Sequence, residues 1–171
     1  MGPKLRFPEK QLPLFASGYK ILPEESKVIG LSPTIMKRGF MEKDELRMIA
    51  HWKAPRSAGR MENNEEDYVR EITKLSFSAT TERARIEILT SLDGVQWPTA
   101  SVILHFFHKD EYPILDFRAL WSVSLAVPTQ YSFDFWWPYV EYCRYLSKRV
   151  NIDMRTLDRA LWQYSKENQK T

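Results

Sequence analysis

Cysteine is almost absent from this sequence, since Cys143 is the single one among 171 residues. One thiol cannot form a disulfide within the chain, and it excludes zinc sites built from cysteine alone and four-cysteine iron–sulfur clusters. No apolar run reaches the roughly 18 residues that a membrane span needs. Residues 1–10 lack the apolar stretch of a signal peptide. We therefore expect a soluble cytoplasmic protein that does not enter a membrane.

Several familiar catalytic patterns are also missing. The chain has no glycine-rich phosphate loop, no Gly-x-Ser-x-Gly nucleophile turn and no zinc-protease helix. His105 and His108 lie three residues apart beside Asp110 and Glu111, but this pattern fixes no third metal ligand. We interpret His108 instead as a cation near a helix C-terminus, where the helix dipole favours positive charge. The sequence thus predicts no metal and no cofactor.

The composition is that of an ordinary folded domain, with 43% hydrophobic, 13% aromatic and 27% charged residues. A net charge of +3 is compatible with a polyanionic partner but is too small to demonstrate one. Five prolines and four glycines fall within residues 1–40, which predicts an arm of short pieces packed on the core, with Ser32 and Pro33 starting a brief helix. Residues 41–171 are expected to form a single helical domain.

Apolar residues recur at helical spacing through most of residues 41–171. The polar stretch 56–64 is predicted to be a mobile surface loop, with Asn64 as the N-cap of the helix that follows. The 98–107 segment is apolar on nearly every side, as in a buried helix, and a buried strand is the less favoured alternative. The predicted class is all-α, with helices over residues 42–53, 65–77, 81–92, 98–107, 116–127 and 154–166. A further helix is expected to follow the aromatic tract 131–142, with Pro138 in its first turn, and to end near Arg149.

Residues 81–107 are predicted to form two helices joined by a tight turn that contains Gly94. Glycine permits a positive φ, and the amides at the start of the second helix can then bind a phosphate oxygen without any side chain. On composition alone an ordinary turn between helices is the favoured alternative, because glycine is common in such turns.

The run Leu92-Asp93-Gly94-Val95-Gln96-Trp97-Pro98-Thr99-Ala100, followed by Asp110-Glu111-Tyr112-Pro113-Ile114-Leu115-Asp116, resembles the helix-hairpin-helix DNA glycosylase superfamily. The residues that lead into the aspartate look most like the 3-methyladenine DNA glycosylase branch. The resemblance covers about residues 81–125. It implies a helix-hairpin-helix over 81–107, a catalytic Asp116 and DNA contacts from Gly94, Val95, Gln96, Thr99 and Arg118.

This sequence departs from the family pattern at three positions. Gln96 replaces the second hairpin glycine. Pro98 stands where members that also cut the strand have a lysine, so a lyase step through a Schiff base is not expected. Arg118 replaces a histidine found after the aspartate in many members, and it could contact phosphate or, as we favour, form an ion pair.

Loss of a base leaves positive charge on deoxyribose, so a fixed carboxylate such as Asp116 can stabilise the transition state and orient water. Asp116 is equally interpreted as a helix N-cap, and the two roles are compatible. A flipped base needs apolar or aromatic walls, for which Trp52, Tyr112, Trp121, Trp136 and Trp137 are candidates, although each is individually more typical of a core residue. The basic residues Lys53, Arg56 and Arg60 could contact phosphate or simply be solvated.

The sequence therefore predicts a monomeric, monofunctional DNA glycosylase-like protein that hydrolyses the N-glycosidic bond of a damaged base in double-stranded DNA. The alternative is a helix-hairpin-helix DNA-binding module without catalysis, since fold likeness does not establish function. A helical protein-interaction domain ranks third.

Overall fold

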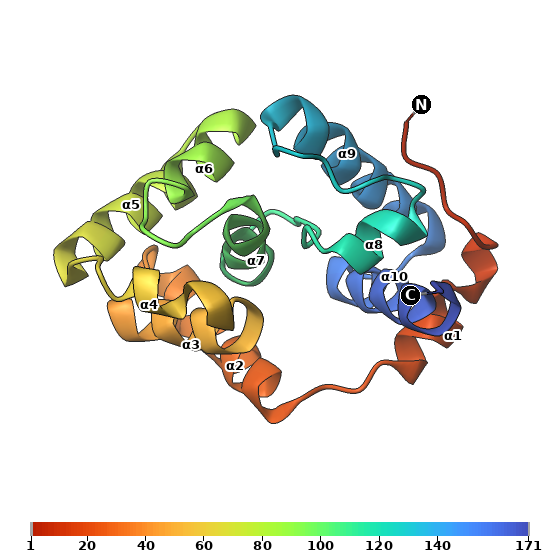
Figure 1. Ribbon diagram of the computed structural model, residues 1–171, viewed down its shortest axis with the longest axis horizontal. Coiled ribbons are helices and arrows are strands. Elements are labelled where there is room, and N and C mark those ends of the chain that lie inside the picture. The colour runs from red at the N-terminus through yellow and green to blue at the C-terminus, as the bar shows by residue number, and fades with distance from the viewer. Residues whose placement is uncertain (1, 171) are drawn as a thin grey trace. The chain divides into compact units, whose positions relative to one another are not determined.

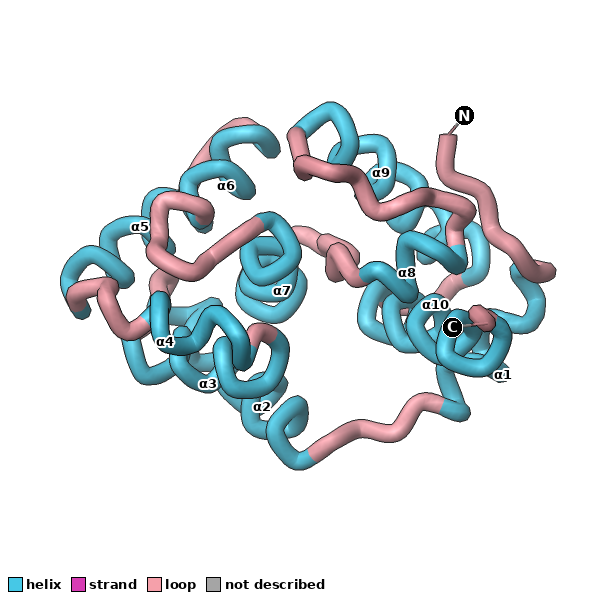
Figure 2. Tube along the Cα trace, viewed as in Figure 1, coloured by secondary structure: helices cyan, strands magenta, loops and turns pink. Residues whose placement is uncertain are grey.

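The computed structural model describes residues 2–170, which form two compact units. The central unit contains residues 21–110, and the terminal unit contains residues 2–20 together with residues 111–170. Helices and loops account for all the described residues, without any strand, which confirms the all-α class (Figure 2). None of the helices within residues 2–170 combines the length and apolar character needed to cross a membrane.

The division into units differs from the expected boundary at residue 40. Residues 2–20 belong with the C-terminal part of the chain, because α1 (Leu12–Gly18) packs on α10 (Met154–Asn168). Residues 21–40 belong to the central unit, because α2 (Pro23–Arg38) packs on α3 (Lys43–Lys53) and α7 (Trp97–Phe107). The first forty residues are therefore shared between two hydrophobic cores and do not form one arm.

The central unit is built around α7 (Trp97–Phe107), which contacts α2, α3 and α6 (Figure 1). Eight of its eleven residues are buried, and the predicted apolar helix is confirmed. A short turn joins α6 to the N-terminus of α7, which lies at one end of this core. The other helices of the unit are α2 (Pro23–Arg38), α3 (Lys43–Lys53), α4 (Ala58–Met61), α5 (Glu66–Ser78) and α6 (Glu82–Leu89), with the 3-10 turn η2 (Pro55–Ser57).

Helix α2 runs for 16 residues through a segment that was expected to contain only short pieces. Pro33 lies inside it and cannot donate the backbone hydrogen bond that this position normally makes. Burial of Val28 and Ile35 offsets this loss. Gly39, at φ +83°, ends the helix by donating its N–H to the Ile35 carbonyl at 2.7 Å.

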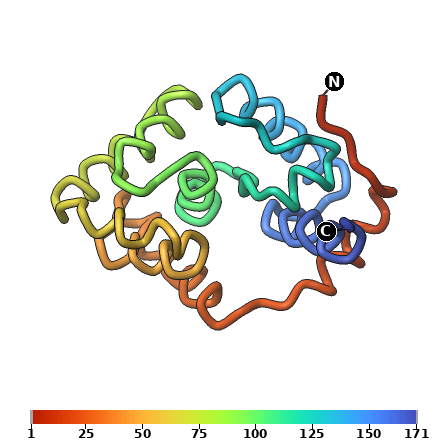
Figure 3. The backbone as a smooth tube through the Cα atoms, in the orientation of Figure 1, coloured from red at the N-terminus to blue at the C-terminus, as the bar shows by residue number. Residues whose placement is uncertain are grey.

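The terminal unit contains η1 (Glu9–Gln11), α1 (Leu12–Gly18), α8 (Phe117–Ser122), α9 (Phe133–Val150) and α10 (Met154–Asn168). Helix α10 packs against α1, α8 and α9, and Figure 3 shows α1, in red, beside α10, in blue. Leu157 and Leu161 of α10 are fully buried, and the Ser122 hydroxyl donates to the Leu161 carbonyl at 2.5 Å. These contacts hold α8 against α10.

Two helix ends in this unit differ from the sequence prediction. Helix α8 ends at Ser122 rather than before Pro128, and Ser124 then adopts a left-handed φ of +61°. Helix α9 begins at Phe133, five residues before Pro138, because Ser132 caps it by accepting from the Phe135 N–H at 3.3 Å. Pro138 therefore lies inside the helix, beyond its first turn.

His108 is neutral and buried, which corrects its interpretation as a dipole-stabilised cation. Burial lowers the pKa of His108, and the positive charge of Arg85 lowers it further. Its Nδ1 atom accepts the N–H of Asp110 at 2.9 Å, while the Asp110 carboxylate lies 3.0 Å from Arg85. The ring thus links the end of α7 to the loop that follows.

The lowered pKa of His108 predicts that the protein loses stability in mild acid. The unfolded chain takes up a proton near pH 6.5, whereas the folded histidine does so at lower pH, so the free energy of unfolding falls as pH drops below about 6.5. Urea denaturation between pH 7.5 and 5 would measure this slope. His108→Gln should flatten it, while the control His51→Gln, at an exposed position, should not. An unchanged slope in His108→Gln would contradict the assignment.

Candidate functional site

The turn between α6 and α7 is short and rigid. Gly94 adopts a φ of +79°, which favours glycine, and the Val95 N–H donates to the Leu92 carbonyl at 3.1 Å. Leu92 and Val95 are buried at 1% and 0% exposure, so both flanks of the glycine are anchored in the core. The Val95 side chain therefore anchors the turn in the core and is not available to a ligand.

Gly94 also lies in close contact with the segment 57–61. A Cβ atom at this position would lie 2.8 Å from Met61 Cγ, 2.9 Å from the Ser57 carbonyl oxygen and 3.0 Å from Arg60 Cβ. Any other residue would force these groups apart. Both the backbone conformation and the lack of space thus require glycine here.

Asn64 is hydrogen-bonded to the turn through both the oxygen and the nitrogen of its side-chain amide. Its Oδ1 accepts the N–H of Asp93 at 2.8 Å, and its Nδ2 donates to the carbonyls of Asp93, at 3.0 Å, and Met61, at 2.9 Å. The prediction of Asn64 as a helix cap is wrong, because Glu65 occupies the N-cap position of α5. The segment expected to be a loop contains η2 and α4, whose Met61 is buried.

Gln96, in place of a second glycine, causes no strain. Its φ of −103° and ψ of 173° are extended values that any residue adopts, and its side chain is exposed. The first turn of α7 directs its amides out of the helix N-terminus, except at Pro98, which has none. Thr99 is only 5% exposed, so it can offer its backbone amide but not its hydroxyl to a large ligand.

Two exposed arginines belong to the segment that packs on Gly94. Arg60 has its Cβ beside the glycine, and Arg56 precedes Ser57, whose carbonyl also contacts it. Within residues 2–170 neither guanidinium forms an ion pair. Lys53, further along, lies with its amine 5.8 Å from the Trp52 ring centre. We call Gly94, Gln96, Arg56 and Arg60 the hairpin patch; it combines outward amides with positive charge.

Asp116, in the terminal unit, is the N-cap of α8. Its Oδ1 accepts the N–H of Arg118 at 2.9 Å, which confirms the capping interpretation. The residues before it are held in the core, since the N–H of Ile114 donates to Asp158 at 3.2 Å and the Ile114 carbonyl accepts from the Tyr139 hydroxyl at 3.0 Å. The Asp116 side chain is partly exposed and its position is fixed.

Tyr131 is an aromatic neighbour of Asp116 that the sequence analysis missed. Burial raises the pKa of Tyr131, and the negative charge of Asp116 raises it further, so the two side chains lie within electrostatic reach. Tyr131 is partly exposed. No spacing rule links residues 116 and 131, because the connection between α8 and α9 is not helical and has no regular period.

The five aromatic residues considered as base-pocket candidates have different environments, and one of them, Trp137, stacks on Phe133 with ring centres 5.9 Å apart. Tyr112 and Trp136 are completely buried and stack on each other with ring centres 5.7 Å apart. Trp121 is partly exposed, stacks on Tyr164 at 5.7 Å and lies under the Arg6 guanidinium at 4.5 Å. Trp52 belongs to the central unit, where it packs edge-on against Phe106 at 5.5 Å. Tyr112 and Trp136 thus serve the core and offer no face to a base.

Arg118 does not form the ion pair that we favoured. Its guanidinium lies 5.5 Å from the centre of the Trp162 ring and 5.0 Å from that of Phe117, and it has no acidic partner within residues 2–170. Cation–π contact therefore holds Arg118 on the surface of α10.

Within residues 2–170, His, Cys, Asp and Glu side chains form no group of three or more that could hold a metal ion. Comparison of the chain with models of protein families, with curated proteins and with solved structures finds no match. A proposal of function therefore has to be argued from the residues of the hairpin patch and from Asp116.

The packing around Gly94 predicts a large penalty for adding one methyl group. Gly94→Ala should lower the free energy of unfolding by about 2 kcal/mol, because the side chain disfavours the positive φ and meets Met61 and Ser57. Gly59→Ala is the matched control, since nothing lies within 4 Å of a Cβ at that helical position. Urea denaturation of both variants would test this, and equal stabilities would refute the proposed constraint.

Proposed function

We propose that this chain binds double-stranded DNA through the hairpin patch and acts as a monofunctional, helix-hairpin-helix type DNA glycosylase on a damaged base. The observation that carries the proposal is the positive-φ turn at Gly94, which packs against α4, is hydrogen-bonded by Asn64 and lies beside two exposed arginines. A turn of this kind is well suited to bind the DNA backbone.

Binding would use groups that are indifferent to base sequence. Amides at the N-terminus of α7 and the positive end of its dipole attract a phosphate oxygen. Arg56 and Arg60 add charge-assisted contacts to phosphate groups on the same strand. Since base excision must work in any sequence context, an anchor without base contacts suits that activity.

Asp116 would supply the chemistry. Its carboxylate would stabilise the positive charge that develops on deoxyribose as the C1′–N bond breaks, and it would orient the water that adds to C1′. The base leaves with a proton, and the products are a free base and an abasic site. Pro98 offers no amine, so hydrolysis would proceed without a covalent intermediate at that position.

A DNA-binding module without catalysis is the second candidate function. The capping bond from Arg118 N–H to Asp116 favours it, because this bond gives the carboxylate a structural role of its own. Both candidates require DNA binding, and only the glycosylase requires turnover.

The hairpin patch predicts DNA affinity that depends on salt. Replacing both Arg56 and Arg60 by Gln should reduce the slope of log affinity against log salt by about 2, because each phosphate contact contributes about one unit. Fluorescence anisotropy with duplex DNA at several salt concentrations measures the slope. Lys27→Gln, at an exposed position of α2, is the control and should keep it. If the double variant keeps the wild-type salt slope, the hairpin patch does not contact DNA.

Asp116→Asn should abolish base release and leave DNA binding intact. Asparagine caps a helix as well as aspartate does, so α8 should keep its stability while the negative charge is lost, and turnover should fall by about 100-fold or more. The assay is release of base from duplexes that carry alkylated, deaminated or oxidised bases.

Asp153→Asn is the matched control, because Asp153 caps α10 by accepting from the Thr156 N–H at 2.7 Å. This variant should retain activity. If the wild-type protein binds DNA but releases none of the bases, the catalytic proposal is wrong and the binding module stands.

A further inference from the structure

Helix α10 carries a stripe of basic residues on the side opposite its buried leucines. Four residues at intervals of four, three and four positions lie on this face of the helix: Arg155, Arg159, Trp162 and Lys166. Lys166 is exposed, and the other three are partly exposed. The stripe therefore reaches the solvent.

Aromatic rings hold the cations of this surface in place. The guanidinium of Arg118, from α8, lies 5.5 Å from the centre of the Trp162 ring, and the Lys166 amine lies 5.2 Å from it. Arg159 lies 5.7 Å from the centre of the Tyr19 ring, which packs edge-on against Trp162 at 5.3 Å. A guanidinium that stacks on a ring keeps the N–H donors at its edge for a further partner. The rings thus position positive charge without consuming its hydrogen-bonding capacity.

Positive charge is in excess on this surface. Asp158, the acidic residue of α10 beside the stripe, is 6% exposed, and its carboxylate accepts from Arg155 at 2.7 Å and from the Ile114 N–H at 3.2 Å. The charge of Arg155 is therefore neutralised within the protein. Within residues 2–170 neither Arg118 nor Lys166 forms an ion pair, so both charges attract an external anion.

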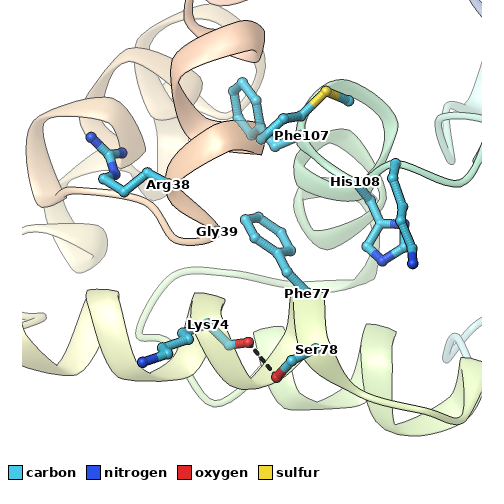
Figure 4. A pocket seen from close by; sticks show the side chains of 9 residues that line it. Arg38, Gly39, Lys74, Phe77, Ser78, Phe107 and His108 are labelled. Atoms are coloured by element: carbon cyan, nitrogen blue, oxygen red, sulfur yellow. Dashed lines mark hydrogen bonds between the residues drawn. The ribbon is translucent and has the colours of Figure 1, made fainter.

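The dipole of α10 does not oppose an anion at this surface. Lys166 belongs to the last turn, but helical side chains point toward the N-terminus, and its amine lies beside Trp162. The pocket of the central unit differs in this respect, because it lies where α2, α5 and α7 end (Figure 4). The negative ends of three helix dipoles disfavour an anion in that pocket.

We propose that Arg118, Arg159 and Lys166, which we call the α10 surface, bind phosphate groups of the DNA strand on which Asp116 acts. This inference rests on the proposed function and adds a second DNA contact to it. The N–H of Arg118 donates to the Asp116 carboxylate at 2.9 Å, so the α10 surface begins beside that residue. From Arg159 to Lys166 the helix rises about 10 Å, the length of about three base steps, which suits successive phosphates.

A nucleic acid backbone fits the α10 surface better than a membrane does. A helix that binds a membrane needs an exposed apolar face that enters the lipid. Here cations lie over both aromatic rings, Tyr19 and Trp162, so the surface presents charge. For the same reason its contacts would be with phosphate and would not depend on base sequence.

Replacing both Arg118 and Lys166 by Gln tests the proposal. The slope of log affinity against log salt should fall by about 2, because each phosphate contact contributes about one unit. Fluorescence anisotropy with duplex DNA measures the slope, and circular dichroism verifies folding. The combination of Arg118→Lys and Lys166→Arg keeps both charges and should keep the slope. Lys10→Gln with Lys148→Gln removes the same charge from exposed positions elsewhere in the terminal unit and should also keep it.

The double Arg56 and Arg60 variant separates this inference from the proposed function. If that variant loses slope while the Arg118 and Lys166 variant does not, the α10 surface is overturned and the hairpin patch stands. The reverse result upholds the α10 surface and rejects the hairpin patch. A wild-type protein that binds no DNA overturns both.

Two further results would overturn the α10 surface as a DNA contact. An equal loss of slope in the Lys10 and Lys148 variant would mean that the effect follows net charge and not position. Sedimentation with phosphatidylserine vesicles is the second arm. If the Arg118 and Lys166 variant loses vesicle binding and keeps its DNA affinity, the partner of this surface is an anionic membrane.

Discussion

The contact between Gly94 and the segment 57–61 is the constraint on which the hairpin depends. A residue with a positive φ and no side chain allows the turn to approach Ser57 and Met61 closely. Asn64 then joins the same segment to Asp93 through hydrogen bonds. One turn thus connects α4, α6 and α7 and determines which way the first turn of α7 faces.

In the function that we propose, DNA binding by the hairpin patch and catalysis use residues of different units. The hairpin patch offers backbone amides and flexible guanidinium groups, which suit a repeating phosphate backbone. Asp116 belongs to the other unit and is a single, positioned carboxylate. Its capping bond holds the side chain in one place, and a fixed charge stabilises a transition state better than a mobile one. The capping role that the structure shows and the catalytic role that we propose would therefore rest on the same carboxylate.

Arg118 and His108 show how the environment determines what a charged or titratable residue does. Arg118 lies over the Trp162 ring and not beside an acid, because α10 places an aromatic face there. His108 ends α7 as the dipole argument required, but burial and Arg85 outweigh the dipole and keep the ring neutral. In both cases the deciding neighbour comes from another helix.

Sequence alone determined the elements whose signals are local. The helix predicted over residues 154–166 is close to α10 as observed, and the apolar character of α7 is evident from its residues, since helical periodicity involves positions three or four apart. Only tertiary structure decided that Pro33 is tolerated within α2, that Asn64 binds a turn 29 residues away, and that Tyr131 lies near Asp116. These outcomes depend on burial and on hydrogen bonds between distant residues, for which the chain carries no periodic pattern.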